Sequence, residues 1–459
     1  MERKQKERKG HLVLVPCPLP SHMSPMLHLA KLLHSQGFSI TIIHTQLNSP
    51  NESHYPEFSF ESIGGSMLES YSVFDGDVML FLSKLNMKCE TPFHECLVNM
   101  QLRCQFNPIS CIIYDAVMYF SAAVADDLKL FRIVLRTSSA ANYIGLSILD
   151  ESDFVSERRM EEPVAGFPFL RIKDMPLFST QKHTREVLTC IYNGTRTASA
   201  IIWNSLWCLE HALFEKIKNE TLVPVFPLGP LQKHCSSFST NALNEEQGCI
   251  AWLDKQAPSS VVYVSIGSVV TMTEDELLEM AWGLANSGRP FLWVVRACVV
   301  NGSDGVEMLP REFHEATRSR CRIASWLPQQ KVLAHTSIGC FLTHNGWNST
   351  IESIAEGVPM LCWPRVGDQR VNARFVSHVW RVGLQLEDRL LREDVESAIR
   401  TLFIDEEGIE IHKRAKELKK KVDISLRQGG ASSEFLSRLV KYISLRRDND
   451  KVVKCLISL

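Results

Sequence analysis

One short segment of the chain concentrates side chains that can bind a small ligand. Residues 326–369 read WLPQQKVLAHTSIGCFLTHNGWNSTIESIAEGVPMLCWPRVGDQ, with an apolar run, a turn at Gly346 and a helical stretch that stops at Gly357. Backbone N–H groups at the start of a helix attract a phosphate, and nearby hydroxyls and an imidazole add hydrogen bonds. We therefore predict that the start of this helix, with His344 beside it, binds a diphosphate.

The two flanks of the segment carry side chains that suit a base and two sugars. Trp326 stands at the end of a short strand, ahead of a turn that begins with proline, where an indole face can stack on a planar base. Glu352 lies one turn into the helix and can reach both hydroxyls of a ribose. Asp368 and Gln369 follow the next strand, and their side chains suit hydrogen bonds to sugar hydroxyls. Base, ribose, diphosphate and sugar can all be assigned a partner.

Each of these residues also has an ordinary structural explanation. Asn348 and Ser349 are good helix caps wherever they occur, and Trp347 suits an apolar core. The joint occurrence of all the parts at these spacings favours the binding site.

The elements that must position this segment follow a regular alternation. Apolar runs such as HLVLVPC, FSITIIHT, ISCIIYD and FRIVLRT alternate with amphipathic helical stretches, and the alternation restarts with SVVYVSIGS, FLWVVR, IGCFLTH and PMLCWP. Strands that are apolar on both faces and separated by helices form parallel sheets with helices on each side. The sequence predicts two doubly wound α/β domains.

The domain boundaries follow from a polar, aperiodic stretch in the middle of the chain. We expect an N-terminal acceptor-binding domain over 1–232, a linker over 233–248 and a C-terminal domain over 249–430. A helix and tail over 431–459 are expected to pack back on the N-terminal domain. With 459 residues the chain is long enough for each domain to bury a core of its own.

Composition excludes several classes of partner. Fifty Lys and Arg against fifty-two Asp and Glu give a formal charge of -2, with no basic face for nucleic acid. No apolar run reaches the roughly 18 residues that a membrane span needs. The glycine patterns of dinucleotide-binding and P-loop proteins are absent, and no acidic pair follows a strand as a metal site requires. We expect a small-molecule ligand, no metal, no nucleic acid, no membrane span and a monomer.

Cysteine usage predicts the compartment. The fourteen cysteines are scattered through apolar runs without a Cys-x-x-Cys pair, which favours reduced thiols in a cytoplasmic protein. The basic start MERKQKERKG is followed by an apolar run too short for a signal peptide, so we interpret it as a solvated tail.

The 326–369 segment resembles the nucleotide-sugar box of plant small-molecule UDP-dependent glycosyltransferases, W-x-P-Q … H … F-x-T-H-x-G-W-N-S-x-x-E … G-V-P … P … D-Q. The resemblance covers essentially the whole chain and is closest to the subgroup that acts on small hydroxy acids, cytokinins, phenolics and terpenoids. It implies a GT-B type fold, in which two doubly wound parallel-sheet (Rossmann-like) domains face each other. It also implies UDP-glucose as the donor substrate, no further cofactor, and a small plant metabolite as the acceptor.

The resemblance assigns roles to individual positions of the donor site. It implies that Trp326 stacks on uracil, that Glu352 binds the ribose, and that a final Gln369 goes with glucose. His344, Asn348 and Ser349 are implied to hold the phosphates, and Trp347, Asp368 and Gln369 to line the sugar. The full set of donor positions is Thr137, Ser268, Trp326, Leu327, Gln329, His344, Gly346, Trp347, Asn348, Ser349, Glu352, Asp368 and Gln369.

The resemblance also assigns a catalytic pair. His22 follows the first strand at the start of the first helix, where the family places its catalytic histidine, although Ser21 replaces the usual preceding glycine. A neutral imidazole suits a general base near pH 7, and Asp115, at the end of an apolar strand, would orient it. The alternative for Asp115 is a cap of the helix that follows. The implied reaction inverts the sugar and gives a β-glucoside.

Four interpretations of function remain open from the sequence. The first is glucosylation of a hydroxyl, a carboxyl or a nitrogen, with small hydroxylated or phenolic acids as the leading acceptors. The same enzyme class acting on cytokinins, flavonoids or terpenoids is the alternative. A UDP-sugar-binding protein without turnover is disfavoured by the His22 and Asp115 pair, and a dinucleotide-dependent oxidoreductase by the missing glycine pattern.

Overall fold

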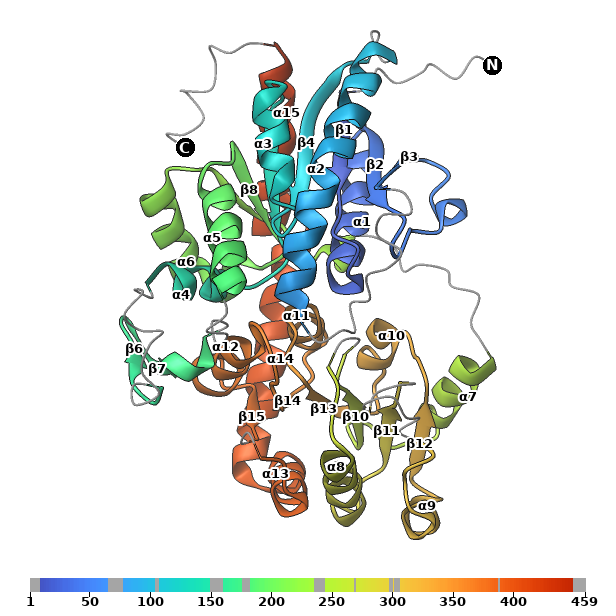
Figure 1. Ribbon diagram of the computed structural model, residues 1–459. Helices are drawn as coiled ribbons and strands as arrows, with labels where there is room; N and C mark the ends of the chain where they lie inside the picture. The colour runs from blue at the N-terminus through green and yellow to red at the C-terminus, as the bar shows by residue number, and fades with distance from the viewer. Residues whose placement is uncertain are drawn as a thin grey trace. The chain divides into compact units, whose positions relative to one another are not determined.

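The protein is represented by a computed structural model that describes residues 9–64, 77–103, 107–148, 160–175, 182–234, 244–267, 270–296, 300, 306–386 and 389–448. The chain divides into two compact units (Figure 1). Unit 1 comprises the described residues within 1–147, 177–237 and 425–459, and unit 2 those within 148–176 and 238–424. Residues 148–176 thus belong to unit 2, although the sequence analysis placed them in the N-terminal domain. Of the predicted linker, residues 235–243 lie outside the described residues, whereas 244–248 form the start of a helix, α7 (Asn244–Leu253).

Unit 1 is built on a seven-stranded parallel sheet of order β3-β2-β1-β4-β5-β8-β9. The first five strands follow the 3-2-1-4-5 order of Rossmann-like folds. Register is set by pairs such as Leu12 with Ile40 and Val13 with Ile112. The strands are β1 (His11–Val15), β2 (Ser39–Thr45), β3 (Ser59–Ile63), β4 (Ile109–Asp115), β5 (Arg132–Arg136), β8 (Ala200–Trp203) and β9 (Val225–Pro227).

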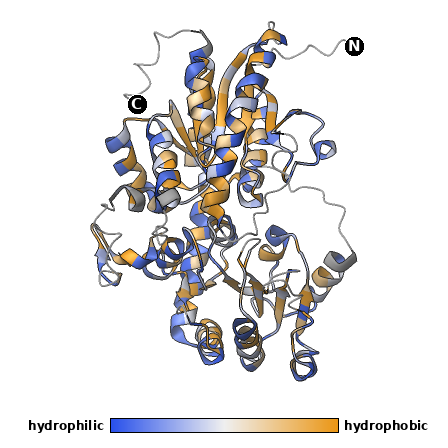
Figure 2. Ribbon diagram, viewed as in Figure 1, coloured by the Kyte–Doolittle hydropathy of each residue, from blue (hydrophilic) through white to orange (hydrophobic). Residues whose placement is uncertain are grey.

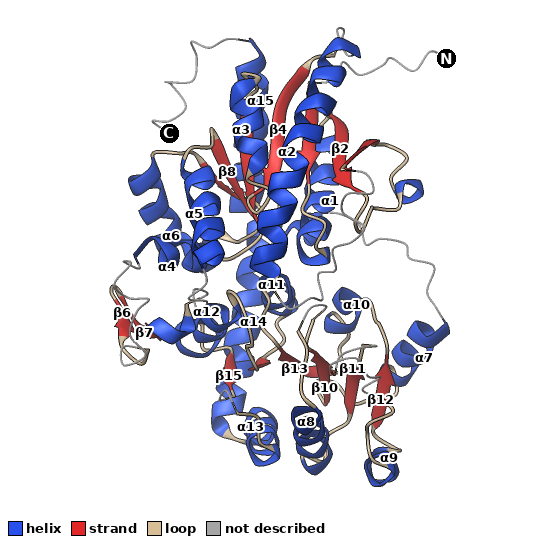
Figure 3. Cartoon of the chain, viewed as in Figure 1, coloured by secondary structure: helices blue, strands red, loops and turns tan. Residues whose placement is uncertain are grey.

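Helices cover both faces of this sheet (Figure 3). They are α1 (Pro20–Ser35), η1 (Glu52–His54), α2 (Val78–Arg103), α3 (Phe120–Asp127), α4 (Ala140–Ile148), α5 (Lys182–Arg196), α6 (Trp207–Thr221), η6 (Leu231–His234) and α15 (Ala431–Asp448). The last of these packs on β4 and β9, where the Tyr442 hydroxyl donates to the Ser199 carbonyl oxygen over 2.8 Å. The C-terminal helix is therefore part of unit 1.

Unit 2 carries a six-stranded parallel sheet of order β12-β11-β10-β13-β14-β15, which is the 3-2-1-4-5-6 order of the Rossmann fold. Its strands are β10 (Val261–Ser265), β11 (Phe291–Val294), β12 (Cys321–Ala324), β13 (Ile338–Thr343), β14 (Met360–Cys362) and β15 (Gly383–Gln385). A small antiparallel hairpin of β6 (Pro163–Val164) and β7 (Phe167–Arg171), followed by η5 (Ile172–Asp174), also belongs to this unit.

The helices of unit 2 include those that carry the predicted donor site. They are α7 (Asn244–Leu253), α8 (Glu274–Asn286), α9 (Arg311–Thr317), α10 (Gln329–Leu333), α11 (Trp347–Glu356), α12 (Gln369–Arg374), the π-helix η7 (Phe375–Val379), α13 (Arg392–Ile404) and α14 (Glu406–Leu426), whose last two residues are counted with unit 1. The predicted helical stretch that stops at Gly357 is α11, whose last residue is Glu356.

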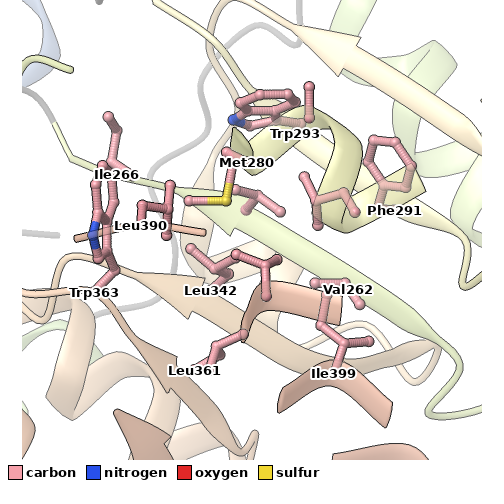
Figure 4. Close-up of a cluster of buried hydrophobic side chains, with 14 of the residues drawn as sticks. Val262, Ile266, Met280, Phe291, Trp293, Leu342, Leu361, Trp363, Leu390 and Ile399 are labelled. Carbon is pink, nitrogen blue, oxygen red and sulfur yellow. The ribbon is translucent and has the colours of Figure 1, made fainter. Parts of the chain in front are cut away.

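The core of unit 2 lies between its sheet and helices such as α8. Val262 and Val264 point to one face of β10, and Leu277, Met280 and Leu284 form the apolar stripe of α8 that covers it. Figure 4 shows Val262 and Met280 in this cluster. In Figure 2 the strands are apolar along their length, whereas the helices alternate apolar and polar faces. Both features are what a parallel sheet buried on two sides requires.

The two parallel sheets confirm the predicted fold class. Each contains the strands that the sequence analysis expected, and each is flanked by helices. Among the described residues, no helix combines the length and the apolar character needed to cross a membrane.

Candidate active site

The catalytic pair predicted in unit 1 lies at the carboxyl ends of β1 and β4. These neighbouring strands mark the point where strand order reverses in the sheet, which is where Rossmann-like folds bind ligands. His22 is the third residue of α1, and Asp115 is the last residue of β4. Ser21 lies in the first turn of α1, so the replacement of glycine there requires no unusual backbone conformation.

The side chains of this pair meet directly. Nδ1 of His22 lies 2.9 Å from Oδ2 of Asp115, which is fully buried, whereas the imidazole is 21% exposed. The other carboxylate oxygen, Oδ1, accepts from the backbone N–H of Val117 over 3.0 Å. Because a carboxylate accepts hydrogen bonds, it favours the tautomer that carries the proton on Nδ1 and the lone pair on Nε2. Helix α3 begins at Phe120, so Asp115 is not its cap.

Thr137 joins this pair from a third strand end. It follows β5, and its hydroxyl oxygen lies 3.0 Å from Nδ1 of His22. The single Nδ1–H is thus shared between the carboxylate and the hydroxyl, which together fix the plane of the ring. This contact was not predicted, because the sequence analysis associated Thr137 with the donor sugar.

The predicted phosphate-binding turn of unit 2 joins β13 to α11. Asn345 adopts a left-handed conformation with φ of 61°, and its N–H donates to Oγ1 of Thr343 over 3.2 Å. Asparagine tolerates this region better than most residues. Gly346 is the cap residue, so Asn348 and Ser349 are helical residues and not caps as the alternative required. Gly357 ends the helix in the left-handed conformation, as predicted.

His344 is enclosed by two glycines. A Cβ on Gly346 would lie 2.6 Å from its Nε2, and a Cβ on Gly267, which follows β10 with φ of 79°, would lie 2.5 Å from its Cε1. Burial and, secondarily, the charge of Arg296 lower the pKa of His344 to about 4. The imidazole is therefore neutral at physiological pH and can donate one hydrogen bond without adding charge.

A hydrogen-bonded group connects α10 to α11 beside this turn. The side-chain amide of Gln329 donates to Oγ of Ser349 over 3.0 Å and to Oε2 of Glu352 over 2.7 Å. The neighbouring Gln330 donates to Oε1 of the same glutamate over 3.2 Å. Both carboxylate oxygens of Glu352 are thus oriented by amides, which preorganises the group.

The aromatic residues of the segment have two different environments. Trp326 is 51% exposed on the loop after β12, as a stacking platform requires. Leu327 beside it is buried. Trp347 is 3% exposed and packs at a ring-centroid distance of 6.3 Å from Trp380, so its indole is mainly part of the core.

The Asp368 and Gln369 pair begins α12. Oε1 of Gln369 accepts from the backbone N–H groups of Arg365 and Val366, over 2.9 and 3.0 Å. That oxygen therefore holds the loop, and the amide nitrogen is the group better placed for a sugar. Asn372, which sequence reasoning missed, donates to Oδ2 of Asp368 over 3.2 Å and to the carbonyl oxygen of Asn345 over 3.0 Å.

Sequence reasoning also missed other parts of this site. Gln330 was visible as the second residue of a Gln pair, but nothing in the sequence places Arg296 near His344. Ser268 lies outside the described residues. Among the residues that the structure describes, no group of three or more His, Cys, Asp or Glu is arranged to hold a metal ion.

Two Rossmann-like sheets, each with a polar site at the reversal of its strand order, are the architecture of GT-B type transferases. UGT2 of Phytolacca americana, solved in complex with UDP-2fluoro-glucose and pterostilbene, has a TM-score of 0.82 and 27% identity, covering 95% of this chain and 100% of that one. A UDP-glucose: anthocyanidin 3-O-glucosyltransferase solved with UDP has a TM-score of 0.82 and 26% identity, covering 96% and 100%.

Sequence comparison gives the same class. The family model described as UDP-glucoronosyl and UDP-glucosyl transferase matches residues 227–414. UDP-glycosyltransferase 76B1 of Arabidopsis thaliana is 41% identical over 445 residues, 95% of this chain and 99% of the relative. Flavonol 3-O-glucosyltransferase UGT76E12 of the same plant is 41% identical over 453 residues, 96% and 98% of the two chains. The chain belongs to the plant UDP-glycosyltransferase family.

Proposed function

We propose that the protein transfers glucose from UDP-glucose to a small plant metabolite with inversion, giving a β-glucoside. The observation that carries the proposal is the contact of 2.9 Å between Nδ1 of His22 and the buried carboxylate of Asp115. It supplies an oriented neutral base, and the turn at His344 supplies a site for the leaving diphosphate.

The reaction is a single displacement. The acceptor hydroxyl gives its proton to Nε2 of His22 as its oxygen forms a bond to the anomeric carbon of glucose. The bond from that carbon to the diphosphate oxygen breaks on the opposite face, and UDP leaves with the electron pair. Asp115 stabilises the imidazolium as it forms. General-base catalysis of this kind contributes about 10²–10⁴-fold to the rate.

The geometry of unit 2 supports a proposed role for each donor residue. Trp326 stacks on uracil, and Glu352, held by two glutamine amides, accepts from the ribose hydroxyls. The start of α11 and the neutral His344 donate to the diphosphate. At the sugar, Asp368 accepts from hydroxyls, whereas Gln369 donates through its amide nitrogen because its oxygen holds the loop.

The acceptor is proposed to be a small hydroxylated or phenolic acid, accepting glucose on a hydroxyl or a carboxyl. The flavonol glucosyltransferase among the relatives supports the alternative of a flavonoid acceptor. Free cysteines throughout the described residues favour a reducing compartment, and we propose the cytoplasm.

The test is a product assay with purified protein. UDP-glucose is supplied with phenolics, hydroxy acids, cytokinins, flavonols and terpenols, and mass spectrometry detects the gain of one hexose. UDP-galactose in place of UDP-glucose, and the His22→Ala variant, are the controls. Product on small acids supports the whole proposal. Product only on flavonols or terpenols overturns the acceptor assignment, and UDP binding without product on any acceptor overturns catalysis.

A further inference from the structure

The hairpin of β6, β7 and η5 carries a buried carboxylate that no step of the proposed reaction uses. Asp174 is 1% exposed, and its Oδ2 accepts from Nε of Arg374 over 3.0 Å. Arg171 donates to the same carboxylate through its backbone N–H over 2.9 Å and through its side chain over 3.1 Å. Two guanidinium groups thus surround one carboxylate.

This ion pair has a definite charge state. Burial alone would raise the pKa of Asp174, but hydrogen bonds from Arg171 and the charges of Arg374 and Arg171 outweigh burial and hold the pKa below its usual range. A buried pair of this kind is costly to break from one side, because the remaining charge has no compensation. It therefore fixes the distance between the hairpin and Arg374.

Arg374 is the last residue of α12, the helix that begins with Gln369. A second contact ties the same helix to the hairpin, since Nη1 of Arg370 donates to the carbonyl oxygen of Lys173 over 3.3 Å. The helix has only six residues and continues into the π-helix η7. Because so short a helix has little stability of its own, its position depends on these tertiary contacts.

An aromatic series extends the contact towards α11. The ring of Phe169 on β7 meets Phe375 edge-on at 5.2 Å, Phe375 meets Trp380 at 5.5 Å, and Trp380 meets Trp347 at 6.3 Å. Figure 1 shows β7 beside α12 in unit 2, in agreement with their contacts. The hairpin thus supports both helix starts that carry the sugar end of the donor site.

We propose that Asp174 is a positioning residue for recognition of the donor sugar. Acting through Arg374, it sets the position of α12 and so of Asp368 and Gln369 relative to Trp347. The inference rests on the proposed function and deepens it, because it separates the sugar end of the donor site from its nucleotide end. The residues proposed to bind the nucleotide lie on other elements: Trp326 on the loop before α10, Gln329 on α10 and Glu352 on α11.

The experiment compares the affinities for UDP and for UDP-glucose. Isothermal titration measures both for the wild type and for Asp174→Asn, and steady-state kinetics give KM for UDP-glucose and kcat. We expect an unchanged affinity for UDP and a loss of about tenfold or more in kcat/KM for UDP-glucose, because displacement of a contact by 1 Å has effects of that order.

Variants of Arg374 test the partner of this carboxylate. Arg374→Lys should retain more activity than Arg374→Met. The double variant Asp174→Asn with Arg374→Met should lose no more activity than the worse of the two single variants.

The matched control is Glu279→Gln. It breaks another ion pair of unit 2, in which Nε of Arg392 on α13 donates to Glu279 on α8 over 2.9 Å, and it should leave both affinities unchanged. Equal losses for UDP and UDP-glucose in Asp174→Asn, with a lower Tm, would show a merely structural role and overturn the inference. So would unchanged kinetics.

A variant that does not fold would be replaced by Arg370→Met, which removes the contact to the Lys173 carbonyl oxygen. We expect it to lower kcat/KM for UDP-glucose by a smaller factor and to leave the affinity for UDP unchanged. The wild type separates this inference from the proposed function. If wild-type protein transfers glucose, and Asp174→Asn affects UDP and UDP-glucose equally or not at all, only the positioning role fails. If the wild type binds UDP but no UDP-glucose, the proposed donor fails first and the inference with it.

Discussion

Each unit has a polar site at the same point of its parallel sheet, but the two sites are built from different groups. In unit 1, residues at the carboxyl ends of β1 and β4 meet through their side chains, His22 with Asp115. In unit 2, the equivalent positions after β10 and β13 are Gly267 and His344, and there the backbone approaches the ring so closely that neither adjacent glycine has room for a Cβ. A site for proton transfer needs aligned side chains, whereas a site for a diphosphate needs accessible backbone N–H groups.

The largest expected effect removes the base of unit 1. His22→Ala should lower kcat by about 10²–10⁴-fold, because it removes the proposed general base. The affinity for UDP, which the proposal assigns to unit 2, should stay unchanged by isothermal titration. The exposed His54 offers a matched control, and His54→Ala should retain full activity. Near wild-type turnover in His22→Ala would remove the base from the mechanism.

The second effect concerns the orientation of that base. Asp115→Asn should lower kcat by about 10²–10⁴-fold, and by no more than His22→Ala, because an amide donor facing Nδ1 favours the tautomer with the proton on Nε2. Thr137→Val removes the hydroxyl contact of 3.0 Å and should cost less than Asp115→Asn, because the carboxylate still holds the ring. Asp127→Asn, at an exposed carboxylate of the same unit, is the control. A larger loss of kcat in Thr137→Val than in Asp115→Asn would show that the hydroxyl, and not the carboxylate, is the main group that orients His22.

The third effect tests the close approach of backbone in unit 2. Gly346→Ala should displace the imidazole of His344, because its Cβ would lie 2.6 Å from Nε2. We expect UDP binding to weaken by about tenfold, equivalent to about 1.4 kcal/mol, with the fold retained. Gly248→Ala in α7, where a Cβ meets nothing within 4 Å, should leave binding unchanged. Unaltered UDP affinity in Gly346→Ala would show that His344 is not part of the phosphate site.

The last prediction leaves the reaction unchanged and concerns the pH dependence of stability. Burial, with the charge of Lys31, lowers the pKa of His28 in unit 1 to about 4. The unfolded state has the higher pKa and binds more protons between pH 6.5 and 4, so this stability is present above about pH 6.5 and is lost as pH falls. At pH 5 the loss is about 2 kcal/mol. His28→Gln should show a smaller fall in the free energy of unfolding between pH 7 and pH 5, measured with urea, and an equal fall would contradict the assignment.

The parts of the site that could be predicted are those that are local in sequence. The phosphate-binding part of the 326–369 segment is one strand, one turn and one helix in succession, so the order of its residues determines how they lie. The apolar strands are also local features of the sequence, and the predicted alternation of strands and helices agrees with the structure. His22 and Asp115 lie 93 residues apart, and only the family resemblance brought them together before the structure did.

The parts that could not be predicted depend on contacts between distant residues. Asp174 and Arg374 are 200 residues apart, and neither stands in a pattern that indicates a buried ion pair. The hairpin lies in sequence among elements of unit 1, so its membership of unit 2 has no sequence signal. The role of Gln369 also depends on three dimensions, because only the loop geometry shows which of its amide atoms is engaged.

The division of the chain has a consequence for the order of synthesis. The polypeptide passes from one unit to the other four times, and unit 1 is completed only by α15, where Phe435 packs against Trp207 at 5.4 Å. A growing chain therefore releases the last strand and most of the helices of unit 2 before the final helix of unit 1. The unit that begins first on the ribosome is the last to acquire its full set of contacts, and a chain cut at residue 237 yields neither unit whole.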